Sequence, residues 1–422
     1  MTPEIKQQIE QIRRGEVPEG FKHNSASVMP CDWNTCDFHE VATIQSGLVS
    51  PKEEPYCFMF HIGPDNIERD TGRIGNLKTA CELGLVSGKF YFDAGSIVYS
   101  KIRPNLNKVC IPNFEGICSA DCYSIKARAG IDRDYLFNLM LSFPFYRRAV
   151  ACSMRTGMPK INQDDLNAIP VVMPSQLEEQ QKIAAILTTQ DKVVELKEKL
   201  LAEKQRQKKY LMQQLLTGKK RLPGFSGEWK VNRLRNIATR HTKRNTIGNT
   251  NALTISAQYG LINQAEFFNK AVASDDKSNY FLLEKGDFAY NKSYSNGYPF
   301  GAIKRLTRYE VGIVSPLYIC FRIKEGSVSG EYLEQYFEAG LMNHEIQAFA
   351  QEGARNHGLL NIAVDDFFNS KILLPSPEEQ TAIAEIFSTA DREIDLLRQD
   401  IEQEKQKKKA LMQLLLTGIV RV

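Results

Sequence analysis

Two short runs of this chain repeat one spacing of tyrosine, lysine and asparagine. The run "GSIVYSKIRPN" starts at Gly95 and the run "GDFAYNKSYSN" starts at Gly286. In both, tyrosine is the fourth residue after the glycine, lysine the sixth, arginine or tyrosine the eighth, and asparagine the tenth. Lysine and arginine bind phosphates or guanine edges, asparagine pairs with adenine, and tyrosine stacks or donates to phosphate. The chemistry that fits this pattern is contact with DNA.

A spacing of two residues places alternate side chains on one face of a β-strand. The predicted DNA-facing residues are Tyr99, Lys101, Arg103, Asn105, Tyr290, Lys292, Tyr294 and Asn296. A solvent-facing strand with ordinary polar residues explains one copy equally well, but the same register in both copies favours a functional face. Loops farther along the chain add the candidates Arg155, Lys160, Arg355 and His357, which ordinary loop residues also explain.

A second repeat supplies elements that position these runs. The sequence "KKYLMQQLLTG" at 208–218 returns as "KKALMQLLLTG" at 408–418, and 178–218 aligns with 378–418 without a gap (378 − 178 = 200). Both segments are rich in helix-forming residues, lack internal glycine and proline, and stop at Gly218 or Gly418. Capping boxes are predicted at Ser175 with Glu178 and at Ser376 with Glu379. Each predicted helix of about 40 residues is about 60 Å long.

Apolar residues recur along both helices with alternating spacings of four and three, which is typical of a coiled-coil seam. The predicted helix-pairing and partner-docking positions are Ile183, Leu187, Val194, Leu201, Leu211, Leu215, Ile383, Phe387, Ile394, Leu397, Ile401, Leu411 and Leu415. Charged residues interrupt the middle of the seam, where we expect weaker pairing. Because a rod this long cannot bury its own apolar stripe, the two helices are expected to pair with each other.

The sequence therefore predicts a globular segment, a long helix, a second globular segment and a second long helix. This architecture is α+β, with an internal pseudo-two-fold repeat. Each globular segment opens with a tryptophan, Trp33 or Trp229, after a Pro-Gly stretch. The predicted boundaries are an N-terminal segment (1–28), a first mixed α/β domain (29–173), a central helix (174–218), a linker with a second mixed α/β domain (219–374) and a C-terminal helix (375–422).

Composition is that of an ordinary globular protein. The chain has 422 residues, of which 42% are hydrophobic and 25% charged, with a net charge of +4. No apolar run approaches the roughly 20 residues of a membrane span, and the start lacks the apolar region of a secretory signal. Eight of the nine cysteines precede residue 153, which argues against a disulfide framework and for a cytoplasmic location. Zinc at Cys31 and Cys36, or at Cys118 and Cys122, is an alternative to buried thiols.

Motifs for catalysis are missing. No glycine-rich dinucleotide or phosphate loop, no HExxH and no GxSxG occurs, and the sequence shows no metal–carboxylate constellation for a nuclease. The sequence therefore predicts no catalytic site and no metal bound by this chain.

With these motifs, the chain resembles the specificity subunit of type I restriction–modification enzymes. The resemblance rests on two copies of "EEQxxIAxI" (178–186 and 378–386), each closely preceded by Pro-Ser and leading into a helix that ends in "LLTG", and on the "PGF…W" stretch at 223–229. It implies two target recognition domains, each reading half of a split target in double-stranded DNA, separated by two antiparallel helices.

The resemblance also implies partners and cofactors. The paired helices would dock two DNA methyltransferase subunits and, through them, restriction and translocase subunits. S-adenosylmethionine, ATP and magnesium would be used by those partners and not bound by this chain. The competing hypothesis is a coiled-coil scaffold or adaptor whose globular domains bind protein.

Overall fold

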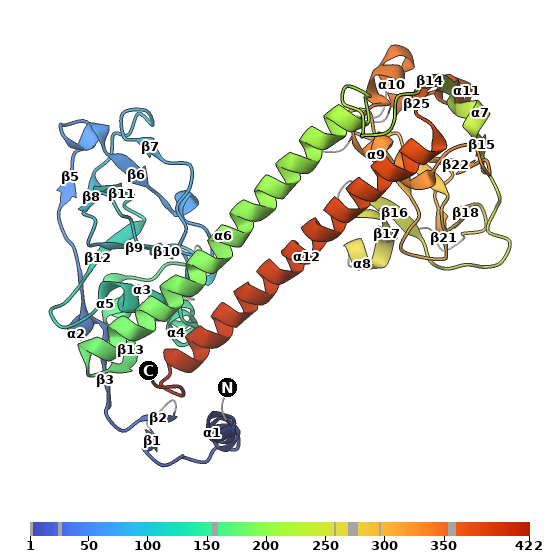
Figure 1. Cartoon of the computed structure of the whole chain (residues 1–422). Coiled ribbons are helices and arrows are strands. Elements are labelled where there is room, and N and C mark those ends of the chain that lie inside the picture. Colours follow the sequence, from blue (N-terminus) through green and yellow to red (C-terminus); the bar gives the residue numbers. More distant parts are fainter. Residues whose placement is uncertain are drawn as a thin grey trace. The chain divides into compact units, whose positions relative to one another are not determined.

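A computed structural model of the chain describes residues 3–23, 28–153, 159–256, 259–268, 277–294, 297–352 and 360–422 (Figure 1). The chain forms two compact units: unit 1 comprises Met1–Lys197 and Asp400–Val422, and unit 2 comprises Glu198–Gln399. Each unit thus combines a globular segment with parts of both long helices. The boundaries drawn from the sequence instead gave each helix a segment of its own.

The elements of unit 1 begin with a helix and a hairpin that precede the globular segment. Its helices are α1 (Pro3–Arg13), α2 (Phe38–Val41), α3 (Arg133–Leu141), α4 (Phe143–Ser153), α5 (Gln163–Asn167) and the first part of α6 (Leu177–Leu215), with short 3-10 turns η1 (Tyr56–Phe58), η2 (Pro64–Asn66) and η3 (Pro104–Leu106). Its strands are β1 (Phe21–His23), β2 (Val28–Pro30), β3 (Trp33–Asp37), β4 (Ala42–Ile44), β5 (Leu48–Val49), β6 (Phe60–Ile62), β7 (Lys78–Thr79), β8 (Lys89–Phe92), β9 (Ile97–Ser100), β10 (Val109–Cys110), β11 (Gly116–Cys118), β12 (Cys122–Ala127) and β13 (Pro170–Pro174).

Unit 2 has a corresponding set. Its helices are α7 (Leu234–Ile237), α8 (Gln264–Phe268), α9 (Gly330–Glu338), α10 (Asn343–Phe349), α11 (Val364–Asn369) and the first part of α12 (Pro377–Leu415). Its strands are β14 (Lys230–Arg233), β15 (Ala238–Arg240), β16 (Leu253–Ser256), β17 (Gly260–Asn263), β18 (Phe281–Glu284), β19 (Phe288–Asn291), β20 (Ala302–Arg305), β21 (Val311–Val314), β22 (Ile319–Ile323), β23 (Gln351–Glu352), β24 (Leu360–Asn361) and β25 (Lys371–Leu374).

The sheets confirm the internal repeat. Unit 1 has a four-stranded antiparallel sheet in the order β10-β9-β12-β4, and unit 2 has one in the order β20-β19-β22-β15. In both units the first strand of the globular segment pairs with the strand that leads into the long helix, β3 with β13 and β14 with β25. Unit 1 also has a five-stranded sheet, β5-β8-β11-β6-β7, where unit 2 has two antiparallel two-stranded sheets, β16-β17 and β18-β21.

The ends of the long helices belong to the cores of the globular segments. In unit 1, Ile183, Leu187 and Leu415 join the cluster that holds Trp33. In unit 2, Ile383 and Phe387 join a second core. The predicted seam is confirmed as a buried stripe: Ile183, Leu187, Val194, Leu215, Ile383, Phe387, Ile394, Ile401 and Leu415 are buried, and Leu201, Leu211, Leu397 and Leu411 are half-buried.

Within each unit, α6 (green) and α12 (red) run antiparallel (Figure 1). The ion pairs between them follow the repeat, because Asp191 accepts from Lys408 in unit 1 and Asp391 accepts from Lys208 in unit 2, each at 2.6 Å. Among the described residues, no helix is both long and apolar enough to cross a membrane.

Charged side chains in the middle of the seam are paired, contrary to the expected weakening. Glu404 in unit 1 accepts from Lys197 at 2.9 Å and from Gln190 at 2.7 Å, and Lys204 in unit 2 bonds Glu393 at 2.8 Å. The basic residues of one helix meet acidic residues of the other, so this part of the seam is held by polar contacts instead of apolar packing.

Of the two predicted capping boxes, the first is wrong and the second is only half formed, because the Glu379 carboxylate bonds Arg221 and Trp229. The Ser376 hydroxyl accepts from the backbone N–H of Glu379 at 3.3 Å, as predicted. Ser175 instead donates to the carbonyl of Asp32 at 3.0 Å. The first helix begins one residue later than the box requires, since the N–H of Gln180 bonds the carbonyl of Gln176.

Candidate functional site

The two tyrosines of the repeated run lie in the protein core, and the prediction that they contact DNA is wrong. Tyr99 lies on β9, paired with Val109 and Tyr123 of the neighbouring strands, and is 2% exposed. Burial raises the pKa of its phenol. The strand is central in its sheet, and Phe145 of α4 packs edge-on against the Tyr99 ring at 6.5 Å between centroids, so this side chain has no route to solvent.

Tyr290 on β19 has the corresponding place in unit 2. It is fully buried, its ring stacks on Phe367 at 5.0 Å between centroids, and its hydroxyl donates to the carbonyl of Phe300 at 2.7 Å. Desolvation raises the pKa of this phenol as well. The tyrosine repeats because both cores use it, not because both units expose it.

The basic residues of the first run come together at the end of β9. The short segment around Lys160 lies beside the segment around Lys101, because Ile161 donates its N–H to the carbonyl of Lys101 at 2.9 Å and Ile102 forms a β-bridge with Lys160. Lys101 is half-buried and its Nζ lies 5.2 Å from the centroid of the Tyr123 ring, while Arg103 and Lys160 are exposed. Burial, with the nearby charge of Lys160, lowers the pKa of Lys101.

The strand does not continue through the run, so the predicted alternation on one face is wrong. β9 ends at Ser100, and Arg103 has a left-handed backbone with φ of 49°. Pro104 then opens the 3-10 turn η3, which includes the exposed Asn105. Proline lacks the N–H that a strand ladder needs, so the chain turns here. Arg103, Asn105 and Lys160 therefore share an exposed loop cluster rather than a strand face.

The second run has a similar loop. Leu360 donates its N–H to the carbonyl of Lys292 at 3.1 Å, which is the counterpart of the bond between Ile161 and Lys101. Lys292 is half-buried and Tyr294 is 63% exposed. Both units thus place a lysine at the end of a central strand, bonded through its backbone to the segment that precedes the long helix. Arg155, Asn296, Arg355 and His357 lie outside the described residues.

The described residues show no group of three or more His, Cys, Asp or Glu side chains arranged to hold a metal. The nine cysteines are free. For the zinc alternative, burial raises the pKa of Cys36 to about 11 and of Cys118 to about 12, which keeps both thiols protonated near neutral pH.

Sequence analysis missed one pair of polar sites, built around Glu179 and Glu379. Each carboxylate accepts from a tryptophan of its own unit and from an arginine that follows a long helix, Arg421 or Arg221. The signal was present in the repeat, because each arginine is the third residue after the glycine that ends a helix.

Comparisons with known proteins agree with this architecture. The family described as "Type I restriction modification DNA specificity domain" matches the chain twice, at residues 30–205 and 226–406. A curated relative, the type I restriction enzyme EcoDI specificity subunit of Escherichia coli, is 41% identical over 181 residues, which is 43% of this chain and 38% of that protein. The match therefore spans less than half of that relative's length.

Two further proteins are similar over more of their length. The type I restriction enzyme MjaVIII specificity subunit of Methanocaldococcus jannaschii is 26% identical over 334 residues, 73% of this chain and 75% of that protein. The solved HsdS subunit from Thermoanaerobacter tengcongensis shares the fold, with a TM-score of 0.51 and 19% identity over 94% of this chain and 99% of that one. The two family matches cover most of the chain, one in each half, and the chain belongs to the family of type I restriction–modification DNA specificity proteins.

Proposed function

We propose that this chain is the DNA-reading subunit of a type I restriction–modification complex, in which each unit reads one half of a split target. The observation that carries the proposal is the shared placement of Lys101 and Lys292 at the end of the central strand of each unit, beside a polar loop. Lysine and arginine there suit the phosphate backbone, and Asn105 suits a base edge. Family membership supports the same role.

The proposal includes partners that act on the DNA once it is read. Two methyltransferase subunits dock on the paired helices, and restriction and translocase subunits join through them. S-adenosylmethionine, ATP and magnesium belong to those partners, and this chain is not itself an enzyme. The coiled-coil scaffold hypothesis has no comparable support, because it does not explain why both units place a lysine at the end of a central strand, bonded to the segment that precedes a long helix.

The test measures DNA binding by the purified chain with its methyltransferase partner as a function of salt. A DNA reader releases counterions, so affinity falls steeply with salt, and each phosphate contact that is removed lowers the slope by about one. The variant combines Lys101→Ala with Arg103→Asn, because asparagine tolerates the left-handed backbone at position 103. We expect a shallower slope, or about 1–3 kcal/mol weaker binding with relaxed specificity at one position.

The matched control removes the same charge elsewhere in unit 1. Lys182 and Lys192 are exposed on α6, and replacing both with alanine should leave the slope unchanged. Equal slopes for wild type, variant and control would remove the Lys101 loop from the interface. Wild-type affinity that does not depend on salt would favour the scaffold. Mapping of methylated adenines with and without this gene then identifies the target.

A further inference from the structure

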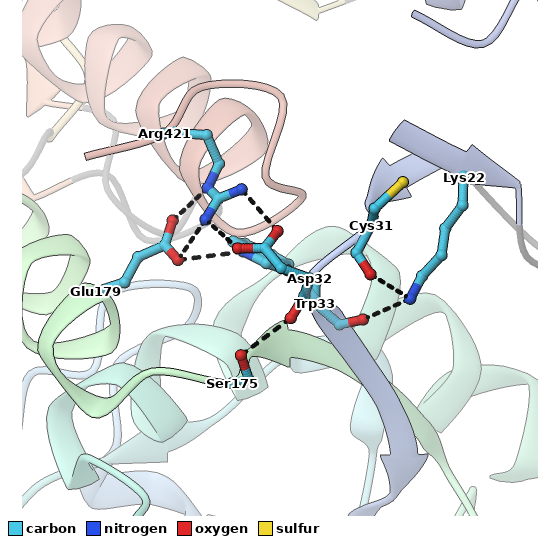
Figure 2. Close-up of polar contacts among 7 residues, drawn as sticks. All are labelled: Lys22, Cys31, Asp32, Trp33, Ser175, Glu179 and Arg421. Carbon is cyan, nitrogen blue, oxygen red and sulfur yellow. Dashed lines mark hydrogen bonds and ion pairs between the residues drawn. The ribbon is translucent and has the colours of Figure 1, made fainter. Parts of the chain in front are cut away.

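Three segments that are distant in sequence meet at one polar cluster in unit 1, which we call the unit 1 joint: Asp32, Trp33, Glu179 and Arg421 (Figure 2). Arg421 follows α12 and Glu179 lies in the first turn of α6. Trp33 begins β3, and Asp32 directly precedes it. Arg421 bonds Glu179 at 2.6 and 2.9 Å and Asp32 at 2.8 Å twice. The guanidinium thus pairs with two carboxylates, each through two hydrogen bonds.

Trp33 completes this joint. Its indole N–H donates to Glu179 at 3.3 Å, and the Arg421 guanidinium lies 6.0 Å from the centre of the ring. Trp33 itself is fully buried in the core. Two neighbours add to the joint: Lys22 donates to the carbonyl of Trp33 at 2.9 Å, and Ser175 donates to that of Asp32 (Figure 2).

Unit 2 repeats the cluster as the unit 2 joint: Arg221, Trp229 and Glu379. Arg221 bonds Glu379 at 2.7 and 2.6 Å, and the Trp229 N–H donates to the same carboxylate at 3.1 Å. The Glu379 side chain is 1% exposed and that of Glu179 is 8% exposed. A carboxylate this buried needs its partners, since an unpaired buried charge is strongly destabilising.

The backbone also brings the tail of each helix onto the tryptophan. Gly418 has φ of 72°, and a Cβ there would meet Pro30 at 2.6 Å and Trp33 at 3.2 Å. Gly218 has φ of 69°, and a Cβ there would lie at an ordinary contact distance of 3.5 Å from Trp229. Both glycines have the left-handed backbone that favours this residue, and at Gly418 the close approach of Pro30 also excludes a side chain. The position of the arginine is therefore fixed on the globular segment as well as on the helix.

The two joints differ in the second contact that the arginine makes. Arg221 bonds Glu379, 158 positions away in sequence, and its other contact is local: the carbonyl of Gly227, six residues away, at 2.9 Å. Arg421 instead reaches Asp32, 389 positions away in sequence. A second carboxylate is present where no local chain connection holds the arginine in place.

We propose that Arg421 and Arg221 are positioning residues that fix, each in its own unit, the orientation of the globular segment on the paired helices. The proposal rests on the proposed function for its consequence, which is that this orientation sets how sharply the gap between the two DNA half-sites is selected. A bidentate guanidinium–carboxylate pair has a defined geometry and so adds directional specificity to the packing of the core. Loosening a joint allows the globular segment to tilt, which changes accepted spacing without changing the bases that are read.

The test uses the full chain with its methyltransferase and a DNA library in which the gap between the half-sites varies one base pair at a time. Wild type should methylate one gap. In Arg421→Ala, the ratio of methylation at neighbouring gaps to that at the natural gap should rise roughly tenfold, the factor that corresponds to a loss of about 1.4 kcal/mol of discrimination. Arg221→Ala should act likewise, and the preferred bases should not change.

Controls separate positioning from general stability. Asp32→Asn removes one of the two carboxylates that Arg421 bonds and should broaden the gap less than Arg421→Ala does. Lys408→Ala removes an ion pair of the same unit outside the joint and should keep a sharp gap. Methylation that falls equally at every gap in Arg421→Ala would overturn the proposal, because loss of folded protein has that effect. Arg421→Lys, which keeps the charge but not the bidentate geometry, should also broaden the gap.

A second measurement does not depend on the proposed function. Hydrogen exchange of the backbone amides of β3 and of the first turn of α6 should be faster in Arg421→Ala than in Lys408→Ala. Equal exchange would show that the arginine does not hold these segments. If the wild-type complex methylates no member of the library, the proposed function fails. The comparison of hydrogen exchange still decides whether Arg421 holds β3 and the first turn of α6 in place.

Discussion

At the residue scale, the repeated run separates into a part that builds the core and a part that faces solvent. Tyr99 and Tyr290 are buried, whereas Arg103, Asn105 and Tyr294 are exposed. A central strand buries side chains on both faces when a helix layer covers one face and a second cluster covers the other, as β9 does with four buried residues in succession. The strand therefore has no exposed face on which the alternating side chains of the run could lie.

Tyr290→Phe tests this division. The change removes the O–H that bonds the Phe300 carbonyl and should lower the free energy of unfolding by about 1 kcal/mol. The salt dependence of DNA binding should not change, since the ring keeps its place on Phe367. Tyr294→Ala is the matched variant: stability should be unchanged and DNA affinity should fall. If Tyr290→Phe binds DNA more weakly while its stability is unchanged, the Tyr290 hydroxyl contributes to DNA binding and the division is wrong.

At the element scale, the long helices are paired by apolar residues near the globular cores and by charges between them. Glu404 is the best connected of these charges, with bonds to Lys197 and Gln190. These bonds lower the pKa of Glu404 to about 2. Because the folded-state pKa lies below the usual 4.5, the contribution of this carboxylate to stability is fully present above pH 4.5 and is lost as pH falls towards 2.

In Glu404→Gln, the stability of the protein should therefore depend less on pH in the acid range. The wild-type melting temperature should fall more steeply between pH 4.5 and pH 2 than that of the variant, and the two should differ most near neutral pH. Glu402→Gln is the control, because Glu402 is exposed and accepts from Gln406 of its own helix. If the two variants follow the same acid profile, Glu404 does not stabilise the seam.

At the scale of the whole molecule, unit 1 is closed by residues from both ends of the sequence, since Asp400–Val422 belongs to it. By the offset of 200 (421 − 221 = 200, 408 − 208 = 200), a second copy of the first half would supply Arg221 in place of Arg421 and Lys208 in place of Lys408. It would supply Lys204 in place of Glu404 (404 − 204 = 200). A second half-length chain thus supplies the arginine and the lysine that residues 400–422 contribute to unit 1. It does not supply the acidic residue in the middle of the seam.

A chain of residues 1–222 should therefore form a symmetric dimer that, with the methyltransferase, modifies a palindromic site. The dimer should be weaker than the intact pairing and should strengthen with salt, because Lys197 and Lys204 would lie among like charges. A chain of residues 1–220 lacks Arg221 and should dimerise less well. Sedimentation of both chains over a range of concentrations measures this. A folded chain of 1–222 that stays monomeric would show that the helices are not the pairing elements.

The sequence by itself determined the repeated architecture, the long helices and the seam, because periodicity and glycine stops act over neighbouring residues. It also placed Lys101 and Lys292 correctly at corresponding positions, since a repeat preserves the register of a strand. Only the tertiary structure decided which residues of the run are exposed, because burial depends on what covers a strand from distant segments. The same holds for Asp32, Glu179 and Arg421: their types and the arginine spacing were visible in the sequence, but only folding brings three distant segments within hydrogen-bonding distance.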